Sequence, residues 1–241
     1  MLFDRIKNSK LLRPLLEEVR KQNGIRAEIL KGMTFNSTIA DSPWLKYKSF
    51  SPGLWAADYG LLYTLYRALG SMKPKAVLEF GLGQSSKMVH QYARYFQAEA
   101  VTVEHDPEWV RFFNEGREGD YDINVMLLDL ETVEYKGYET ASYKGLDKAL
   151  EGRKFDFVIV DGPFGSDHYS RLEILDIARD HLAPTFCIIM DDTDREGERE
   201  TADEVIRLLK EKGTDVCSTT CASSKKHTII ASADMKFLMT L

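Results

Sequence analysis

The chain has 241 residues, of which 44% are hydrophobic. This suits one large globular domain, or one domain with a short extension, and excludes a disordered chain. The net charge of −6 disfavours non-specific binding to a phosphate backbone, so we expect no nucleic-acid partner. Cys187, Cys217 and Cys221 lack CxxC spacing, which argues against a zinc site or a disulfide framework and favours a cytoplasmic protein with reduced thiols.

The N-terminal segment is charged throughout and shows no signal-peptide core. No apolar run approaches the ~20 residues that cross a bilayer, so we expect no membrane span. Residues 1–30 are predicted to be mostly helical, with Pro14 as a break. Apolar residues recur at helical spacing between Leu11 and Val19. They indicate a packing or dimerising helix or, alternatively, a face that lies on a membrane surface.

The next segment, residues 32–53, contains glycines, prolines and several aromatic residues, which predicts an irregular stretch. We therefore expect an N-terminal helical extension or lid over residues 1–53 and a second unit over residues 54–241. The second unit opens with an amphipathic helix predicted over 54–70.

Five short apolar runs follow and are separated mainly by helical patterns. The runs are 76–80, 100–106, 123–130, 155–162 and 185–192, and the helical patterns are 85–96, 107–116, 170–182 and 196–213. Continuous apolar runs suit strands buried on both faces, and the alternation requires crossover connections. The predicted fold is α/β: a Rossmann-like, mostly parallel sheet flanked by helices, with a C-terminal antiparallel hairpin within 215–234.

Ligands bind such sheets beyond the carboxyl ends of the strands. The first predicted strand carries Glu79 and leads into Gly81 and Gly83, followed by Gln84, Ser85 and Ser86. Two glycines allow a tight turn and close approach to a ligand at the start of the next helix. The third glycine of a dinucleotide fingerprint is replaced by Ser86, which disfavours a nicotinamide cofactor.

Acidic residues end the next two predicted strands. Glu104 lies 21 residues after Gly83, and a carboxylate at this position can accept two hydrogen bonds from a ribose diol. Asp129 ends the third run and would lie near an adenine edge.

Three further carboxylates end the fourth and fifth predicted strands: Asp161, Asp191 and Asp192. Neighbouring strands would bring these carboxylates together at one edge of the sheet, where they would repel each other unless a cation lay between them. They therefore predict a Mg²⁺ site. Alternatively, one or two line the pocket and the rest cap helices or turns.

A polar group of residues follows the fourth strand and the fifth strand. His168 could take a proton from an alcohol, or it is a surface histidine. Arg171 and Arg195, with Glu198, could hold a polar or acidic acceptor. Alternatively, Arg195 belongs to a salt-bridged helix start.

Together these segments resemble the class I S-adenosylmethionine-dependent methyltransferases over roughly residues 50–212. VLEFGLGQSS resembles the first family motif, which implies that Glu79, Gly81 and Gly83 contact the methionine end of S-adenosylmethionine. The resemblance also implies that Gln84, Ser85 and Ser86 line the same turn. VTVEHD resembles the second motif, which would place Glu104 on the ribose hydroxyls and His105 beside the adenine.

VIVDG followed by IIMDD is similar to metal-using O-methyltransferases, and the resemblance implies that Asp161, Asp191 and Asp192 hold Mg²⁺. The run DGP…G…SR, then DD…R..E, is also similar to methyltransferases acting on glucuronic acid in xylan, which favours a carbohydrate acceptor. The catechol type has a lysine shortly after the fourth-strand acid. Here that stretch is Gly162-Pro163-Phe164-Gly165, so His168 is our candidate base.

The sequence thus predicts a cytoplasmic S-adenosylmethionine-dependent O-methyltransferase acting on a hydroxyl of a sugar or saccharide-containing small molecule, with Asp161 and His168 as catalytic residues. Two alternatives stay open: an aminopropyltransferase of the spermidine synthase type, and a non-catalytic cofactor-binding protein. Aromatic residues near the N-terminus would stack on a sugar or pack a helical lid: Trp44, Tyr47, Phe50 and Trp55. The N-terminal helix is a candidate homodimer interface.

Overall fold

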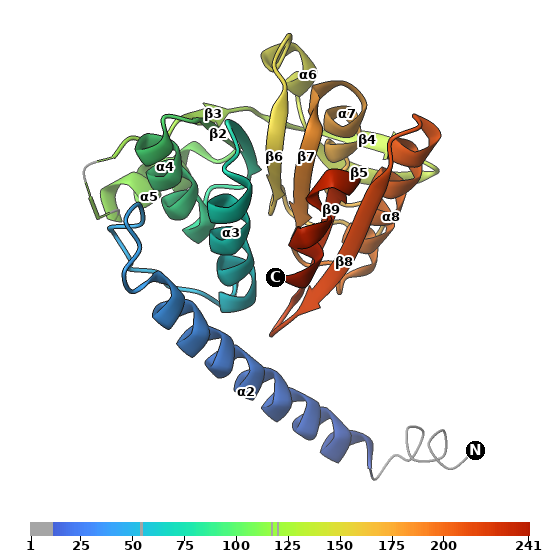
Figure 1. Cartoon of the computed structure of the whole chain (residues 1–241). Helices are drawn as coiled ribbons and strands as arrows, with labels where there is room; N and C mark the ends of the chain where they lie inside the picture. Colours follow the sequence, from blue (N-terminus) through green and yellow to red (C-terminus); the bar gives the residue numbers. More distant parts are fainter. Residues whose placement is uncertain (1–11, 54, 117, 120) are drawn as a thin grey trace.

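The computed structural model describes residues 12–53, 55–116, 118–119 and 121–241. A seven-stranded sheet forms its centre (Figure 1). Its strands are β1 (Ala76–Phe80), β2 (Glu99–Glu104), β3 (Val125–Leu127), β6 (Phe155–Val160), β7 (Leu182–Met190), β8 (Val216–Ala222) and β9 (Lys226–Ser232). Their order is β3-β2-β1-β6-β7-β9-β8, and every pairing is parallel except the two that β9 makes with β7 and β8. The predicted Rossmann-like sheet with a C-terminal hairpin is confirmed.

Helices cover both faces of this sheet. They are α2 (Arg13–Ile39), α3 (Tyr59–Met72), α4 (Gln84–Phe96), α5 (Pro107–Gly116), α6 (Leu146–Ala149), α7 (Ile174–Asp176), the π-helix η1 (Ile177–His181), α8 (Glu196–Glu211) and the 3₁₀ helix η2 (Ala233–Thr240). One apolar layer lies under α2, α3, α4 and η2, and the other under α6, α7, η1 and α8. Within β1, Val77 faces the first layer, whereas Leu78 and Phe80 face the second. Both faces are apolar, which explains the continuous hydrophobic runs.

The N-terminal extension is more helical than the sequence predicted. Residues 32–53 were expected to be irregular, but α2 continues to Ile39. Gly32 does not end the helix: a β-carbon there would lie 3.0 Å from carbons of the Tyr59 ring, and the helical residues that follow bury Phe35 and Ile39 in the core. Pro14 lies in the first turn, where it needs no hydrogen-bond partner and does not break the helix. The helical prediction for residues 1–11 lies outside the described residues.

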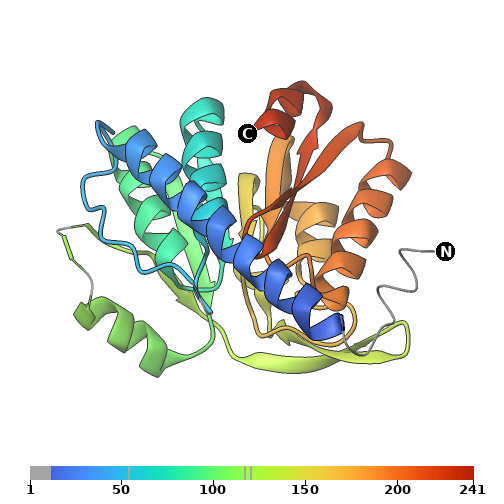
Figure 2. The ribbon, with the colours of Figure 1, turned by 90° about the horizontal axis from the view of Figure 1, so that it is seen from below.

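The long helix α2 crosses the molecule when it is seen from below (Figure 2). It is tied to α3 by Glu28, whose carboxylate accepts the Tyr59 backbone N–H at 2.7 Å. The helix predicted over 54–70 begins later, after Asp58, which caps α3 by accepting the Leu61 N–H at 2.8 Å. No helix among the described residues is both long and apolar enough to cross a membrane.

Two predicted elements after β2 were wrong in extent. The strand predicted over 123–130 shortens to three residues of β3, because the chain then enters a separate hairpin of β4 (Leu130–Tyr135) and β5 (Tyr138–Tyr143). The signal for this hairpin is the Lys136-Gly137 pair, both with positive φ, between alternating polar and apolar residues. The helix predicted over 170–182 contracts to α7 and η1, because residue 182 already begins β7.

Candidate functional site

A cavity of about 400 Å³ opens at the carboxyl ends of the parallel strands. Its wall is formed by residues that follow β1, β2, β6 and β7, together with Trp55, Trp109 and Tyr143. The order of strands changes direction between β1 and β6, since β1 connects onward to β2 on one side and pairs with β6 on the other. A crevice at such a switch point is where open α/β sheets bind ligands.

The turn after β1 forms one wall of the cavity. Gly81 has a φ of +91°, and a β-carbon there would lie 2.4 Å from the backbone oxygen of Asp161. The Gly81 N–H donates to the Val103 carbonyl at 2.9 Å. Only glycine fits this conformation and this close approach. The turn therefore brings the ends of β1, β2 and β6 together around one space.

The helix α4 begins immediately after this turn. Gly83 precedes α4, and its N–H donates to Ser86 Oγ at 2.9 Å. Ser85 and Ser86 are buried, and Gln84 Oε1 accepts the Ser51 N–H at 3.0 Å. These residues shape the turn and the helix start, and they do not line the cavity itself.

Glu104 ends β2 and lies in the cavity wall. Its Oε1 accepts the N–H groups of His105 and Asp106 at 2.6 and 3.0 Å, and its Oε2 accepts the Leu82 N–H at 3.0 Å. These bonds fix the carboxylate, and the single bond to Oε2 leaves that atom able to accept a second donor. His105 lies beside it in the wall, 2.7 Å from Oε1 through Nδ1.

Glu79 lies under the turn and is fully buried. Burial raises its pKa to about 7, although hydrogen bonds from Ser85, Thr102 and Ser86 act in the opposite direction. Thr102 Oγ1 donates to Glu79 Oε2 at 2.7 Å. Glu79 is not part of the cavity wall. It would therefore influence a ligand indirectly, by holding the residues of the turn in place.

The predicted carboxylate cluster exists. Oxygen atoms of Asp161, Asp191 and Asp192 lie within 4.8 Å of one another. Two cations lie among them: Arg171, whose Nη2 is 2.8 Å from Asp192 and 3.4 Å from Asp161, and Lys225, whose Nζ is 3.2 Å from Asp192 and 3.7 Å from Asp191. The structure thus brings together a charge network rather than three isolated acids.

The pKa values of this network follow from burial and from these cations. Burial raises the pKa of Asp161 to about 6 and that of Asp191 well above its ordinary value. Burial would also raise the pKa of Asp192, but Arg171 and Lys225 together hold it below its ordinary value. Burial would lower the pKa of Lys225, but the neighbouring carboxylates raise it, so its amino group stays charged.

The cluster fits Mg²⁺ poorly. Arg171 and Lys225 supply, from the chain itself, the positive charge that a divalent cation would provide. Asp191 is buried and is absent from the cavity wall, so an ion at this residue would not be reached from the cavity directly. These contacts favour an ion-paired network of side chains over a bound Mg²⁺ ion.

A second cavity of about 700 Å³ adjoins the first. The two share Trp55, Phe164, Gly165 and Arg195 as lining residues. Trp55 and Phe164 present exposed rings, with 85% and 69% of their surfaces accessible. The shared rim means that a molecule in one cavity can touch a molecule in the other.

His168 lines the second cavity, whereas Asp161 lines the first, so these two predicted catalytic residues are not in one pocket. The His168 Nδ1 lies 3.1 Å from both carboxylate oxygens of Glu200, and its ring lies 4.1 Å from the Tyr138 ring. A carboxylate on Nδ1 orients an imidazole and leaves Nε2 to accept a proton. Sequence reasoning missed Glu200, whose signal is its place in the acidic run after Arg195.

The remaining predicted site residues are Arg195, Arg171 and Asp129. Arg195 lies in both cavity walls and pairs with Asp192 and Glu198 at 3.2 and 3.4 Å. Arg171 is 3% exposed, lines the first cavity and pairs with Asp161 and Asp192 within the network. Asp129 is exposed and lies in neither cavity wall. Lys225 was not predicted, because it lies in a polar hairpin turn far from the motifs in sequence.

No protein-family model matches the chain, and no curated protein matches it in sequence. A solved structure, the methyltransferase PaMTH1 of Podospora anserina bound to S-adenosylhomocysteine, is 17% identical, with 94% of this chain and 97% of that chain covered and a TM-score of 0.50. The chain has the Rossmann-like methyltransferase fold.

Two further solved structures are similar at lower scores. A methyltransferase from Pyrococcus furiosus is 15% identical over 84% of this chain and 96% of that chain, with a TM-score of 0.44. A ribosomal protein L11 methylase from Lactobacillus delbrueckii subsp. bulgaricus is 16% identical over 76% and 83%, with a TM-score of 0.45.

Proposed function

We propose that the protein is an S-adenosylmethionine-dependent O-methyltransferase that acts on a hydroxyl group of a sugar or saccharide-containing small molecule. The observation that carries this proposal is the pair of adjoining cavities with a common aromatic rim. The first has the features of a cofactor site, and the second has room and side chains for an acceptor.

The residues of the first cavity fit the cofactor. The Gly81 turn leaves the backbone open to a ligand, and Glu104 Oε2 can accept a hydrogen bond from a ribose hydroxyl. His105, Trp109 and Phe164 offer flat surfaces for an adenine ring. When bound, S-adenosylmethionine supplies a methyl group that is already activated by its positively charged sulfur.

The side chains of the second cavity suit a saccharide. Exposed aromatic rings such as Trp55 and Phe164 pack against the apolar faces of sugar rings. Asp167 and Glu196 can accept hydrogen bonds from hydroxyl groups, and Arg195 offers donors at the boundary between the cavities. The protein would hold the acceptor hydroxyl toward the first cavity, and this positioning is its main catalytic contribution.

His168 is the proposed base. An alcohol becomes a good nucleophile as it loses its proton, and Nε2 of His168 would accept that proton while Glu200 stabilises the resulting positive charge. Asp161 is assigned to the wall of the cofactor cavity, where Arg171 and Lys225 balance the carboxylates of the network. This arrangement favours a reaction that needs no divalent metal.

The aminopropyltransferase alternative requires free carboxylates to bind a diamine. Asp161 and Asp192 face the cavity, but Arg171 is already paired with both of them. This pairing leaves little net negative charge for a diamine, and it disfavours the alternative.

The test is methyl transfer from labelled S-adenosylmethionine to a panel of sugars, nucleotide sugars, uronic acids and catechols, with Mg²⁺ and with EDTA. We expect transfer to a saccharide hydroxyl that EDTA does not abolish. Loss of transfer in EDTA, restored by Mg²⁺, would reinstate the metal site. Binding of the cofactor without transfer to any acceptor, or turnover only with a decarboxylated cofactor and a diamine, would overturn the proposal.

The role of His168 is tested in the same assay. We expect His168→Gln to lower kcat about 10²-fold or more near neutral pH, the usual effect of losing a general base, with a small change in KM. Glu200→Gln should lower kcat less and shift the pH–rate profile. His181→Gln is the matched control, because His181 also pairs with an acid, Asp147, but lies in neither cavity. Equal activity of His168→Gln and the control would remove His168 from the mechanism.

A further inference from the structure

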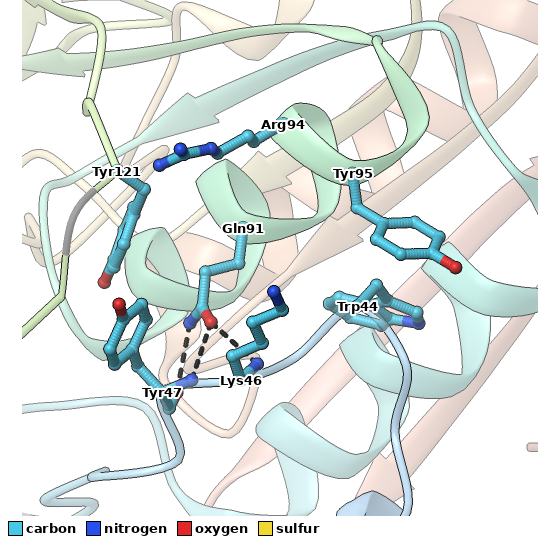
Figure 3. A pocket seen from close by; sticks show the side chains of 7 residues that line it. All are labelled: Trp44, Lys46, Tyr47, Gln91, Arg94, Tyr95 and Tyr121. Carbon is cyan, nitrogen blue, oxygen red and sulfur yellow. Dashed lines mark hydrogen bonds between the residues drawn. The ribbon is translucent and has the colours of Figure 1, made fainter.

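A separate pocket of about 310 Å³ lies on the outer side of α4 (Figure 3). It shares no lining residue with the two cavities at the sheet edge. Its wall combines four aromatic rings with two cations: Trp44, Tyr47, Tyr95 and Tyr121, then Lys46 and Arg94. This volume is at the lower end of the range of small-molecule sites.

The aromatic rings stand on two sides of the pocket. Figure 3 shows Tyr47 and Tyr121 on one side and Trp44 and Tyr95 on the other. Tyr47 and Tyr121 are stacked with ring centroids 5.7 Å apart. Trp44 is buried and supported from behind by Tyr66, whose ring is stacked on it at 4.9 Å. Trp44 and Tyr121 are 5% and 3% exposed, so Tyr47 and Tyr95, at 37% and 51%, present most of the ring surface that a planar ligand can contact.

The backbone that carries two of these residues is fixed by Gln91. This side chain is 5% exposed, and its Oε1 accepts the N–H groups of Lys46 and Tyr47 at 2.9 and 2.8 Å. Its Nε2 donates to the carbonyls of Tyr47 and Lys87, both at 3.0 Å. Every polar atom of Gln91 is therefore used to hold the pocket in shape, which lowers the ordering cost of binding a ligand.

The pocket is positively charged. Its lining contains Lys46 and Arg94 and no Asp or Glu. Neither cation lies in an ion pair with any residue that the structure describes. In Figure 3 the Lys46 side chain lies between the two aromatic sides, and the Arg94 guanidinium extends toward Tyr121. Both charges are thus available to an anionic group on a ligand that is already held between the rings.

We propose that this pocket binds a small anion that carries a flat ring, with the ring held by the aromatic side chains and a phosphate or carboxylate held by Arg94 and Lys46. The proposal is independent of the methyltransferase function. Tight binding requires both the ring and the anionic group of the ligand, because the aromatic side chains alone do not select for charge and the two cations alone do not select for shape.

The test is calorimetric binding of four probes to the full chain: uridine monophosphate, uridine, inorganic phosphate and indole-3-acetate. We expect a ring-bearing anion to bind at least about tenfold more tightly than uridine or phosphate, because only it uses both kinds of contact. Tighter binding of uridine monophosphate than of indole-3-acetate identifies a phosphate ligand, and the reverse order identifies a carboxylate ligand. Either order supports the proposal.

Variants locate the binding. Arg94→Gln and Tyr95→Ala, both at exposed positions of α4, should each weaken the bound anion about tenfold. Arg67→Gln, an exposed arginine on α3 outside the pocket, is the matched control and should bind like the unchanged chain. Glu104→Gln should also leave binding unchanged, which excludes the cavity at the sheet edge.

Three results would overturn the proposal. The first is that no ring-bearing anion binds, and the second is that uridine or phosphate alone binds as tightly as the complete anion. The third is that Arg94→Gln binds as well as Arg67→Gln, with a Lys46→Gln variant giving the same answer. None of these results depends on methyl transfer, so a failure here is distinguishable from a failure of the proposed enzyme activity.

Discussion

Replacing Arg171 by methionine would test the charge network beside the first cavity. Arg171 Nη1 donates to the carbonyls of Val160 and Asp191, both at 3.1 Å, and Nη2 donates to Asp192 at 2.8 Å. Nη2 also lies 3.4 Å from Asp161. Methionine has a similar length but no charge and no donor, so the variant removes these contacts with little change in volume.

The size of the effect follows from what the substitution leaves behind. The side chain is 3% exposed, so water cannot replace the guanidinium easily. Removing one partner of a buried ion pair costs about 3–5 kcal/mol, because the remaining charges stay buried without compensation. We therefore expect Arg171→Met to lower the free energy of unfolding by about 3–5 kcal/mol at neutral pH, a large share of the ~5–15 kcal/mol typical of a domain.

The loss of stability in Arg171→Met should also depend on pH. The pKa of Asp161 is raised from 3.8 to about 6 in the folded chain. The folded state therefore holds this proton more tightly, and the associated stabilisation is present below pH 3.8 and lost as the pH rises through about 6. Without Arg171 this pKa rises further, so the stability deficit should shrink between about pH 8 and about pH 5.

Urea unfolding followed by circular dichroism measures both effects. The control is Arg111→Met, because Arg111 is an exposed arginine whose ion pair with Glu108 should contribute less than about 1 kcal/mol. If Arg171→Met costs no more than Arg111→Met, or if its deficit grows as the pH falls, the ion-paired network described above is not the native arrangement.

Two further predictions concern Gly81, in the turn after β1, and the buried acid Glu79. Gly81→Ala should destabilise the fold by more than Gly137→Ala in thermal melts: both glycines have positive φ, which costs about 1–2 kcal/mol for alanine, but only Gly81 would also meet backbone atoms. Equal melting temperatures would refute the close approach. The pKa of Glu79 is raised from 4.5 to about 7, so the free energy of unfolding of the unchanged chain should fall as the pH rises through this range. Glu79→Gln should reduce this pH dependence, as measured by urea unfolding at a series of pH values. An unchanged slope would mean that Glu79 is not buried as described.

The parallel sheet was predictable because its strands carry their signal locally. The runs around Val77 and Val158 are apolar on both faces, and Gly81 marks the turn that follows the first of them. These features depend on a few adjacent residues, so the sequence alone indicates them. The cavity-lining residues Glu104 and His105 were found for the same reason, since they end such a strand.

The wrong predictions depend on contacts between distant parts of the chain. The part of α2 after Gly32 packs Phe35 and Ile39 into the core against distant segments, and no local pattern reveals those contacts. Lys225 joins the carboxylate network through a hairpin turn that lies 33 residues beyond Asp192 in sequence. The sequence suggested His168 as a base, but its contact with Glu200 and its position in the second cavity come from the way α8 packs beside the loop after β6.

The hairpin of β8 and β9 has a consequence for the order in which the molecule can be completed. Its turn delivers Lys225 to Asp192, and Ser223 and Ser224 both donate to Asp58, the residue that caps α3. On a ribosome, a nascent chain that has not yet released this hairpin would hold every glycine and carboxylate of the site but lack the ammonium group that balances them. The site therefore cannot mature strand by strand as the chain emerges, and it becomes complete only when the final antiparallel pair is added to the sheet.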